Sequence, residues 1–374
     1  MSWPSALRAC LRSLLRLSLR LPASLHAPFS TRLMATPPAS HIDCSCYYTT
    51  NLFVNQTHYN FRSRAEFERE HAAALARLGE PERLDLIQRL LAEQARRRGL
   101  NAAAAHRTRA IASGYTPLHP QLWRLSADFL HPDLVRIVHG ELAPRMLAHG
   151  VYALPVFSPL FCRLVCEELA HFAASGMPAG RPNSMNRAGL LLDELGLGGG
   201  LLDPFLREYL SPLCKAIPVL RAAGGEVFFS LTRPISPICQ SPFFPYLTFE
   251  FSFEDLERHK SFVVSYRMGD DEQLSAHFDN AEVTLNVNIG LEFEGGELVF
   301  HGGPHGLPSD TYHEWGTVGH GVLHLGRQIH SALPISRGER HNLVVWMRSP
   351  KHRRVHGCPM CGRTDLLLEE DASA

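Results

Sequence analysis

Five short runs of β-forming residues between Ser261 and Met347 constrain the fold of this chain more than any other feature. The runs read SFVVSY, EVTLNVNIG, GELVF, GVLHLG and HNLVVWM, and glycine, proline or charged turn residues separate them. Branched and aromatic side chains favour strands because they pack well on a pleated surface. Several short strands at roughly even spacing predict a β-sandwich or barrel over about 257–350.

The region before these strands is helical in character. Residues 41–150 contain a helix-forming stretch from 63 to 99, which Pro81 divides because proline interrupts the hydrogen bonding of a helix interior. Within 151–225, the apolar spacing of residues 159–176 predicts an amphipathic helix that ends at a glycine. We therefore predict an α+β fold, in which a helical N-terminal region and a helical support precede the β domain.

Two segments stand outside this scheme. Residues 1–40 open with a basic stretch, since the first 33 residues hold five arginines and no acid. That profile is typical of a mitochondrial transit peptide; the alternative is a true start at Met34, with the upstream residues an extension of the gene model. Residues 226–256 are rich in phenylalanine and proline, and the prolines exclude a helix or a central strand. We interpret this segment as an insertion.

Charge and cysteine content exclude several classes of protein. Lysine plus arginine and aspartate plus glutamate number 37 each, so a zero net charge gives no electrostatic signal for nucleic acid or an anionic membrane. The sequence has no run of about 18–20 uncharged apolar residues that would span a bilayer. The nine cysteines are odd in number and scattered, which argues against a disulfide scaffold and for a reducing, intracellular compartment.

Three residues of the predicted β domain form a candidate metal site. His277 and Asp279 are two apart, so on a strand both side chains leave the same face. His330 can supply a third ligand from a distant strand. Two histidines and one carboxylate that leave three positions open are the pattern of non-haem Fe(II) oxygenases, whereas catalytic zinc usually keeps one open position. With 21 histidines in the chain, His-x-Asp alone is a weak signal, and the ordered context carries the prediction.

An arginine ten residues after His330 suggests the co-substrate. Arg340 lies on the predicted strand RHNLVVWM, and a planar guanidinium binds a carboxylate through two parallel hydrogen bonds. A 2-oxoacid that chelates the metal and reaches Arg340 with a second carboxylate would be 2-oxoglutarate. Tyr266, on the strand before His277, is placed to donate a further hydrogen bond to it.

These segments are similar to the prolyl/lysyl hydroxylase type of 2-oxoglutarate- and Fe(II)-dependent oxygenases. The resemblance rests on Tyr, His-x-Asp, Thr-x-Asn, Phe-x-Gly-Gly-x-Leu, Gly-x-x-x-His and His-x9-Arg in this order, and it covers about 261–349. RPNSMN at 181–186, Cys-Ser-Cys at 44–46 and CPMC at 358–361 extend it to roughly 41–365. It implies a double-stranded β-helix, or jelly roll, with flanking helices.

The resemblance also implies the composition of the site. It assigns the role of catalytic iron ligand to His277, Asp279 and His330. It assigns Arg340 as the anchor of the co-substrate, and it places Tyr266, Thr284 and Asn286 beside the co-substrate. It implies Fe(2+) and L-ascorbate as cofactors, and 2-oxoglutarate, O2 and a protein or peptide as substrates. The expected reaction is hydroxylation of a lysine or proline side chain, with release of succinate and CO2.

Two other functions remain open on the sequence. The segment 226–256 precedes the strand that carries Tyr266, so an impaired oxygenase fold that acts as a binding module is one alternative. A zinc-dependent hydrolase using the same histidines and aspartate is another. The compartment is also open: mitochondrial with a genuine leader, cytosolic with a Met34 start, or the endoplasmic reticulum by analogy with lysyl hydroxylases, against which the missing secretory signal counts.

The tail at 351–374 holds a second metal-like pattern. Cys358 and Cys361 form half of a structural zinc knuckle. Two pairs are candidates for the other half, namely Cys44 with Cys46 and His352 with His356. The sequence does not choose between them.

Overall fold

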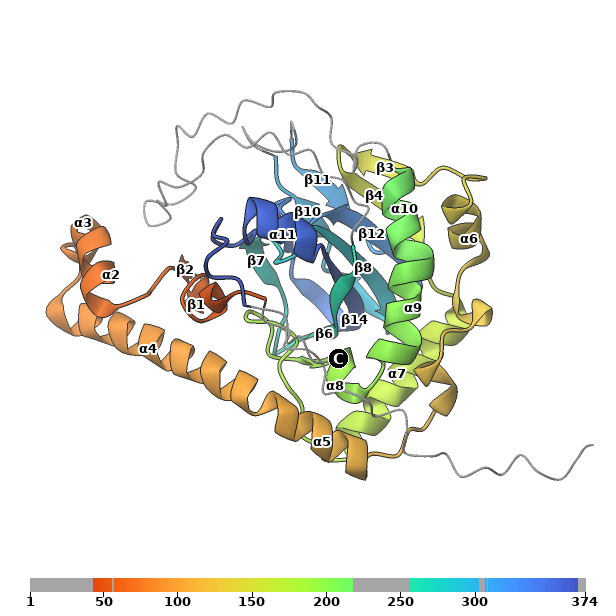
Figure 1. The fold of residues 1–374 in the computed structure, drawn as a ribbon, viewed down its shortest axis with the longest axis horizontal. Coiled ribbons are helices and arrows are strands. Elements are labelled where there is room, and N and C mark those ends of the chain that lie inside the picture. Colours follow the sequence, from red (N-terminus) through yellow and green to blue (C-terminus); the bar gives the residue numbers. More distant parts are fainter. Residues whose placement is uncertain (1–42, 56, 218–255, 303–306, 308, 369–374) are drawn as a thin grey trace, which may run out of the picture. The chain divides into compact units, whose positions relative to one another are not determined.

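The computed structural model describes residues 43–55, 57–217, 256–302, 307 and 309–368 (Figure 1). The leader expected at 1–40 and all but the last residue of the insertion expected at 226–256 lie outside these residues. Of the helices described, none has both the length and the apolar character that crossing a membrane requires.

Two antiparallel sheets form the β domain and confirm the predicted jelly roll within an α+β fold. The larger sheet has the strand order β3-β4-β12-β8-β14-β6-β5, with β9 also paired to β14, and the smaller has the order β11-β10-β13-β7. The strands of the larger sheet are β3 (Arg145–Ala148), β4 (Val151–Pro155), β5 (Gly189–Leu191), β6 (Arg258–Arg267), β8 (Val283–Gly290), β9 (Phe293–Gly295), β12 (His320–Leu325) and β14 (Ile335–Arg348). Those of the smaller sheet are β7 (Leu274–His277), β10 (Leu298–Phe300), β11 (Thr311–His313) and β13 (His330–Ala332).

The five predicted runs correspond to β6, β8, β10, β12 and β14. Strand β11 of the smaller sheet was not predicted, and β7 and β13 were expected only as the strands that carry His277 and His330, because three or four residues of mixed polarity give no clear alternation. The region taken as helical support also contributes β4 and β5 to the larger sheet, and β3 and β4 form one edge of it. These strands add to the helices expected there.

Strand β8 explains how the larger sheet serves a core and a site at once. Its two neighbours are β12 and β14, so it lies in the centre of the sheet. Successive side chains of a strand point to opposite faces. Val283, Leu285 and Val287 therefore join the main core, while Thr284 and Asn286 face the cavity between the two sheets.

Helices cover the face of the larger sheet opposite the smaller sheet. They include α6 (Pro132–Val138), α7 (Pro159–Ala174), α8 (Leu192–Leu195), α9 (Asp203–Phe205) and α10 (Ser211–Ala216), with the helical turns η3 (Pro120–Trp123), η4 (Ala127–Phe129), η5 (Gly198–Leu202) and η6 (Leu206–Leu210). Helix α7 matches the amphipathic helix predicted at 159–176 and packs on β8. Its buried residues Phe161, Val165 and Phe172 belong to the main core.

The N-terminal cap of α7 gives a testable contribution to stability. Ser158 Oγ accepts a hydrogen bond from Phe161 N–H at 3.3 Å and donates one to Asp128 O at 2.6 Å. We expect Ser158→Ala to lower the free energy of unfolding by about 1 kcal/mol, because a helix N–H loses its partner. Chemical denaturation measures the change, and Ser113→Ala, at an exposed hydroxyl of helix α5 (Ala104–Gly114), is the control that should stay within about 0.5 kcal/mol. Equal effects of the two changes would contradict this assignment of the cap.

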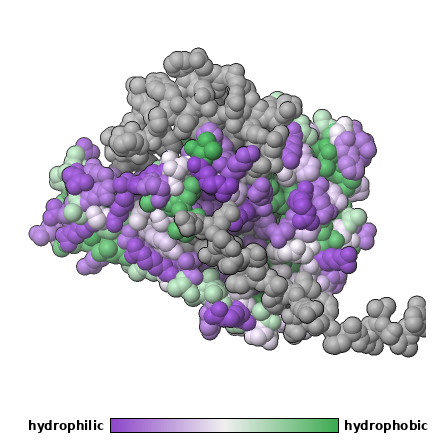
Figure 2. Space-filling view, viewed as in Figure 1, coloured by the Kyte–Doolittle hydropathy of each residue, from purple (hydrophilic) through white to green (hydrophobic). Residues whose placement is uncertain are grey.

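The N-terminal region is mostly helical but begins with a small β-hairpin. Its elements are η2 (Ser45–Tyr48), β1 (Leu52–Val54), β2 (Thr57–Tyr59), α2 (Arg64–Glu70), α3 (Ala72–Leu75), α4 (Glu80–Ala102) and α5 (Ala104–Gly114). Pro81 lies in the first turn of α4, where its missing N–H is tolerated, so the helix begins there. Figure 2 shows mainly hydrophilic side chains over the α2–α4 part, on the left of the view, with small hydrophobic patches between them.

A buried arginine joins α4 to the segment that starts the described chain. Arg97 is 2% exposed, and its guanidinium donates to the carbonyl oxygens of Tyr47, Thr50 and Asn51 at 2.7, 3.1 and 2.5 Å. Its Nε also donates to Glu93 Oε1 at 2.9 Å. Buried charge is tolerated where every hydrogen bond is satisfied, so this contact fixes the position of η2 against α4.

Candidate metal centre and co-substrate pocket

The smaller sheet places two histidines directly opposite each other. His277 ends β7 and His330 begins β13, and the two residues are paired in the register of these strands. Asp279 lies two residues beyond the end of β7, which corrects the expectation that it shares a strand face with His277. A hydrogen bond from its backbone N–H to Gly326 O, at 2.8 Å, turns the chain so that the carboxylate meets both rings.

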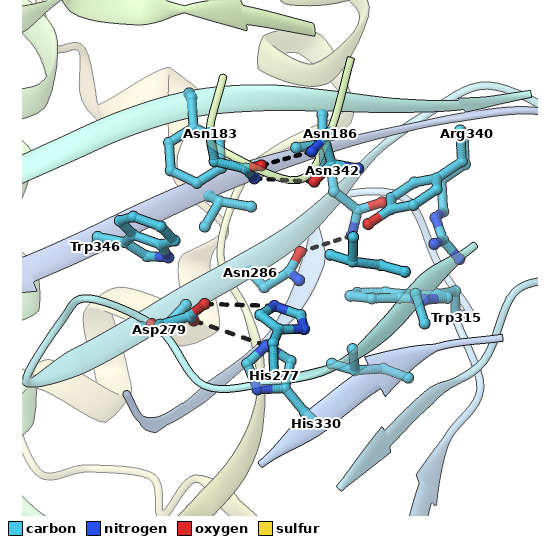
Figure 3. A pocket seen from close by; sticks show the side chains of 18 residues that line it. Asn183, Asn186, His277, Asp279, Asn286, Trp315, His330, Arg340, Asn342 and Trp346 are labelled. Atoms are coloured by element: carbon cyan, nitrogen blue, oxygen red, sulfur yellow. Dashed lines mark hydrogen bonds and ion pairs between the residues drawn. The ribbon is translucent and has the colours of Figure 1, made fainter. Parts of the chain in front are cut away.

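The three side chains predicted as a metal site come together in space. His277 Nε2 is 3.6 Å from Asp279 Oδ1, and His330 Nε2 is 3.7 Å from Asp279 Oδ2. One donor atom from each residue lies within 4.8 Å of the others. Figure 3 shows both imidazoles directed toward the carboxylate. Two groups of histidine, cysteine or acidic side chains in the described residues are close enough to hold a metal ion, and this is the one that contains histidine and carboxylate.

The hydrogen bonds of the imidazoles leave the correct nitrogens free for a metal. His277 Nδ1 lies 2.8 Å from Ser275 O, and His330 Nδ1 lies 2.9 Å from Gln328 O. A carbonyl oxygen only accepts, so each Nδ1 carries the proton and each Nε2 presents a lone pair. Burial and the neighbouring His330 lower the pKa of His277 to about 4, so its ring is neutral at pH 7. Neutral imidazole is the form that binds metals, so this donor set fits Fe(II).

Thr284 and His324 surround the carboxylate from the larger sheet. Thr284 Oγ1 donates to Asp279 Oδ2 at 2.7 Å. Although burial opposes ionisation, His330 and His277 hold the pKa of Asp279 below its usual value. His324 is fully buried, and its Nε2 lies 4.0 Å from Asp279 Oδ2 without a hydrogen-bond partner among the described residues. The Thr284 hydroxyl therefore orients the carboxylate, and His330 and His277 favour its ionised form.

Removing the hydroxyl that orients Asp279 should weaken the metal centre. We expect Thr284→Val to lower the apparent affinity for Fe(II) about 10-fold, because groups that orient a metal ligand contribute to affinity on this scale. Thr284→Ser keeps the hydroxyl and should retain most of the affinity. The iron dependence of succinate formation measures both. A valine variant with unchanged iron affinity would show that the hydroxyl does not act through Asp279.

Arg340 is held in a fixed position between aromatic rings. It is 1% exposed, and its guanidinium carbon lies 4.6 Å from the ring centre of Tyr266 and 5.2 Å from those of Phe293 and Trp315. Its Nη1 donates to Gly296 O. Gly296 has φ +73°, and a Cβ there would lie 2.6 Å from that Nη1, so glycine is required for the contact.

Part of this guanidinium remains available to a ligand. Arg340 Nε is buried and has no hydrogen-bond partner within the part of the chain that the structure describes. Burial lowers the pKa of Arg340 to about 10, so it is still charged at pH 7. Burial raises the pKa of Tyr266, which therefore keeps its proton and can donate it. A buried cation beside a phenolic donor is a site for a carboxylate.

The cavity between the sheets contains polar residues that the sequence analysis did not assign to a site. Besides the predicted residues, Asn183, Asn186, Trp315, Asn342 and Trp346 line it (Figure 3). Asn342 Nδ2 donates to Asn286 Oδ1 at 2.7 Å, and Asn183 Nδ2 donates to Asn186 Oδ1 at 2.9 Å. The RPNSMN segment, which extends the family resemblance, was the available signal for the first two. Asn342 and Trp346 follow Arg340 on β14 at intervals of two and six residues, so their alternation was readable.

A larger cavity adjoins the first. Its volume is about 470 Å³, and both cavities are lined by Asn183, His277 and Trp346. Its walls come from η2, β2 and α4 on one side and from β6, β7 and the loop at 181–185 on the other. The candidate metal centre therefore borders a space much larger than a small co-substrate needs.

The structure also resolves the pairing of the C-terminal cysteines. Cys358 and Cys361 meet Cys44 and Cys46, and not the two histidines of α11 (Pro350–His356). His352 and His356 stack on each other with ring centres 4.3 Å apart.

Comparison with known proteins gives a consistent result over most of the chain. The sequence model of one family, described as an OGFOD2-like domain, matches residues 111–218. The chain is 34% identical to 2-oxoglutarate and iron-dependent oxygenase domain-containing protein 2 of Xenopus tropicalis over 90% of its own length and 93% of that protein. It is 35% identical to the Homo sapiens protein of the same name, over 89% and 93%. A procollagen lysyl hydroxylase and glycosyltransferase of Acanthamoeba polyphaga mimivirus is 24% identical over 62% of this chain and 23% of that protein.

Proposed function

The chain belongs to the family of 2-oxoglutarate and iron-dependent oxygenase domain-containing protein 2, and on this premise we propose that it couples the oxidative decarboxylation of 2-oxoglutarate to hydroxylation of a protein side chain. The observation that carries the proposal is the convergence of His277 Nε2, His330 Nε2 and the Asp279 carboxylate beside the buried cation of Arg340. The products are succinate, CO2 and a hydroxylated side chain.

Each residue of the site has a defined task in this proposal. His277, Asp279 and His330 would hold Fe(II) through His277 Nε2, His330 Nε2 and the Asp279 carboxylate. Arg340 binds the distal carboxylate of 2-oxoglutarate, and Tyr266 donates a hydrogen bond to it. When bound, the iron supplies the activation of O2 and the oxidation of a C–H bond, while the protein supplies orientation and excludes water.

Thr284 and Asn286 act beside the co-substrate. Thr284 holds Asp279, and Asn286 is fixed by Asn342 so that its amide faces the cavity. The aromatic walls around Arg340 lower the local dielectric, which strengthens its interaction with a carboxylate. We also propose that ascorbate, acting from solution, reduces iron that has been oxidised to Fe(III) back to Fe(II). The pocket does not need to hold this reductant.

The proposed substrate is a protein or peptide, with lysine or proline as the target side chain. The 470 Å³ cavity beside His277 is large enough for a side chain with part of its backbone. The mimivirus relative is named as a procollagen lysyl hydroxylase, which favours lysine as the first target to test.

Succinate formation tests the proposal directly. The purified full chain is incubated with Fe(II), ascorbate, 2-oxoglutarate and peptide libraries that contain lysine or proline, and succinate and peptide masses are measured. We expect succinate to require both iron and 2-oxoglutarate, and one library to gain the mass of one oxygen. Binding of 2-oxoglutarate without any turnover would favour the binding module instead, and bound zinc without affinity for 2-oxoglutarate would favour the hydrolase.

A further inference from the structure

Four cysteines from the two ends of the described chain converge at a place that the proposed reaction does not use. We call them the cysteine cluster, which consists of Cys44, Cys46, Cys358 and Cys361. Cys44 Sγ is 3.8 Å from Cys361 Sγ, and Cys46 Sγ is 3.7 Å from Cys358 Sγ. All four sulfur atoms lie within 4.8 Å of one another, and all four thiols are free.

These separations match the edges of a tetrahedral zinc site. A Zn–S bond of about 2.3 Å and a tetrahedral angle place two sulfur atoms about 3.8 Å apart. Bonded sulfur atoms of a disulfide lie about 2.05 Å apart, so the cluster as placed holds thiols. Four thiolates leave no open position, and this composition is typical of structural rather than catalytic zinc.

The C-terminal half of the cluster is a turn that presents two thiolates together. The N–H groups of Cys361 and Gly362 both donate to Cys358 O, at 3.2 and 2.7 Å. Met360 N–H lies 3.4 Å from Cys358 Sγ and donates to it. Gly362 has φ +69°, a conformation that favours glycine. The turn therefore directs both thiols to one point and supports one of them by a backbone donor.

The N-terminal half is brought to this turn by backbone pairing. Ser45 N–H donates to Leu366 O at 2.9 Å, and Leu368 N–H donates to Asp43 O at 3.0 Å. Cys44 and Leu367 form an antiparallel bridge between these bonds. The two halves thus meet through contacts that do not involve a metal, so the ligand set is preorganised.

Two buried arginines connect the cluster to the catalytic domain. Arg348 at the end of β14 lies 2.6 Å from Asp43 Oδ2, and Arg353 of α11 lies 3.0 Å from the same atom. Arg353 also contacts Glu282 Oε1, just before β8, at 3.0 Å. Both guanidinium groups act electrostatically on Cys358 and offset part of the negative charge that four thiolates would carry.

We propose that the cysteine cluster binds one structural zinc ion, separate from the iron site. Zinc suits four thiolates and has no redox chemistry of its own, so the site would hold the chain without reacting. Iron is the competitor, because a tetrahedral set of four sulfurs also accepts it. The buried position of three of the four cysteines favours a permanent structural ion over an exchangeable one.

Zinc in this position would fix one wall of the 470 Å³ cavity. Cys44, Cys46 and Met360 line that cavity together with His277 and Phe278. The same segment continues into Tyr47, Thr50 and Asn51, whose carbonyl oxygens accept hydrogen bonds from Arg97 of α4. Zinc binding itself stands apart from the proposed function, and only the role of this wall for a substrate rests on it.

Metal analysis of the full chain tests the zinc site. After purification without chelators, we expect close to one zinc per chain in the wild type and in Cys214→Ser, which replaces a buried core cysteine outside the cluster. Cys361→Ser should lose nearly all of this zinc. Removal of zinc from the wild type should speed hydrogen exchange of residues 43–61 at least about 10-fold, because local opening is no longer tied to breaking the metal bonds.

A second measurement keeps the proposal testable if the serine variant does not fold. Cobalt(II) added to the metal-depleted wild type should give the intense visible absorption of tetrahedral thiolate coordination, and alkylation of the four cysteines should be blocked until the metal is removed. Wild-type protein without zinc and without this absorption would overturn the proposal. So would iron in the four-thiolate site, or a native disulfide between Cys44 and Cys361. If Cys361→Ser lost zinc but formed succinate at the wild-type rate, the zinc site would be supported and its role would be confined to the fold.

Discussion

His330→Ala is expected to lower 2-oxoglutarate-dependent succinate formation at least about 100-fold. The change removes one of three protein ligands, and loss of even an indirect partner of a ligand commonly lowers metal affinity or activity 10- to 100-fold. His330 is 4% exposed, and its side chain lines the cavity. Succinate by mass spectrometry and bound iron after anaerobic loading measure the two consequences together.

His320→Ala is the matched control. His320 lies on β12 of the same jelly roll, half-buried, and its ring contacts His131 rather than the cavity. We expect this variant to keep succinate formation within about two-fold, since substitutions away from a site usually have small effects. If His330→Ala retained substantial turnover while His320→Ala lost it, the assignment of the iron ligand would be wrong.

Arg340→Gln is expected to raise the KM for 2-oxoglutarate by about 10- to 150-fold. This range corresponds to the 1.5–3 kcal/mol of a hydrogen bond to a charged group, which the buried guanidinium would provide to the distal carboxylate. The three metal ligands are unchanged, so kcat should fall less than kcat/KM. Steady-state succinate formation as a function of 2-oxoglutarate concentration separates the two parameters.

Arg337→Gln on the same strand controls for the loss of an arginine. Arg337 is exposed and pairs with Glu294 at 2.7 Å, away from the cavity. Because Arg337 does not line the cavity, the KM of this variant for 2-oxoglutarate should be unchanged. Loss of the exposed ion pair should lower stability by at most about 1 kcal/mol. A fall in kcat with an unaltered KM in Arg340→Gln would instead place the arginine in the architecture of the site rather than on the co-substrate.

The strongest sequence signals were those of short range. The runs that form β6, β8 and β14 were predictable because alternation and β-branched residues are properties of a single strand. The spacing of His277 and Asp279 was a weak signal by itself and gained weight only from the ordered motifs around it, and the carboxylate reaches the site from a turn rather than from the strand. The helix at 159–176 was readable from its apolar stripe and the glycine that ends it.

Features that depend on distant partners were not readable. Strand β13 has three residues and is defined only by its pairing with β7 and β10. Asn183 and Asn186 face the cavity because their loop is held beside β6, where Ala188 O accepts a hydrogen bond from Ser265 N–H. Nothing in the composition of such a loop states which strand it will contact.

The sequence by itself determined the helical and β segments, the candidate ligands and the family to which the chain is similar. The tertiary structure alone decided which further residues meet: Thr284 with Asp279, Arg340 with Gly296, and Cys44 and Cys46, rather than the histidines of α11, with Cys358 and Cys361. The reason is physical. Local conformational preference and side-chain chemistry depend on residues that are close in the sequence. Strand register and packing between distant segments depend on the burial of the whole core.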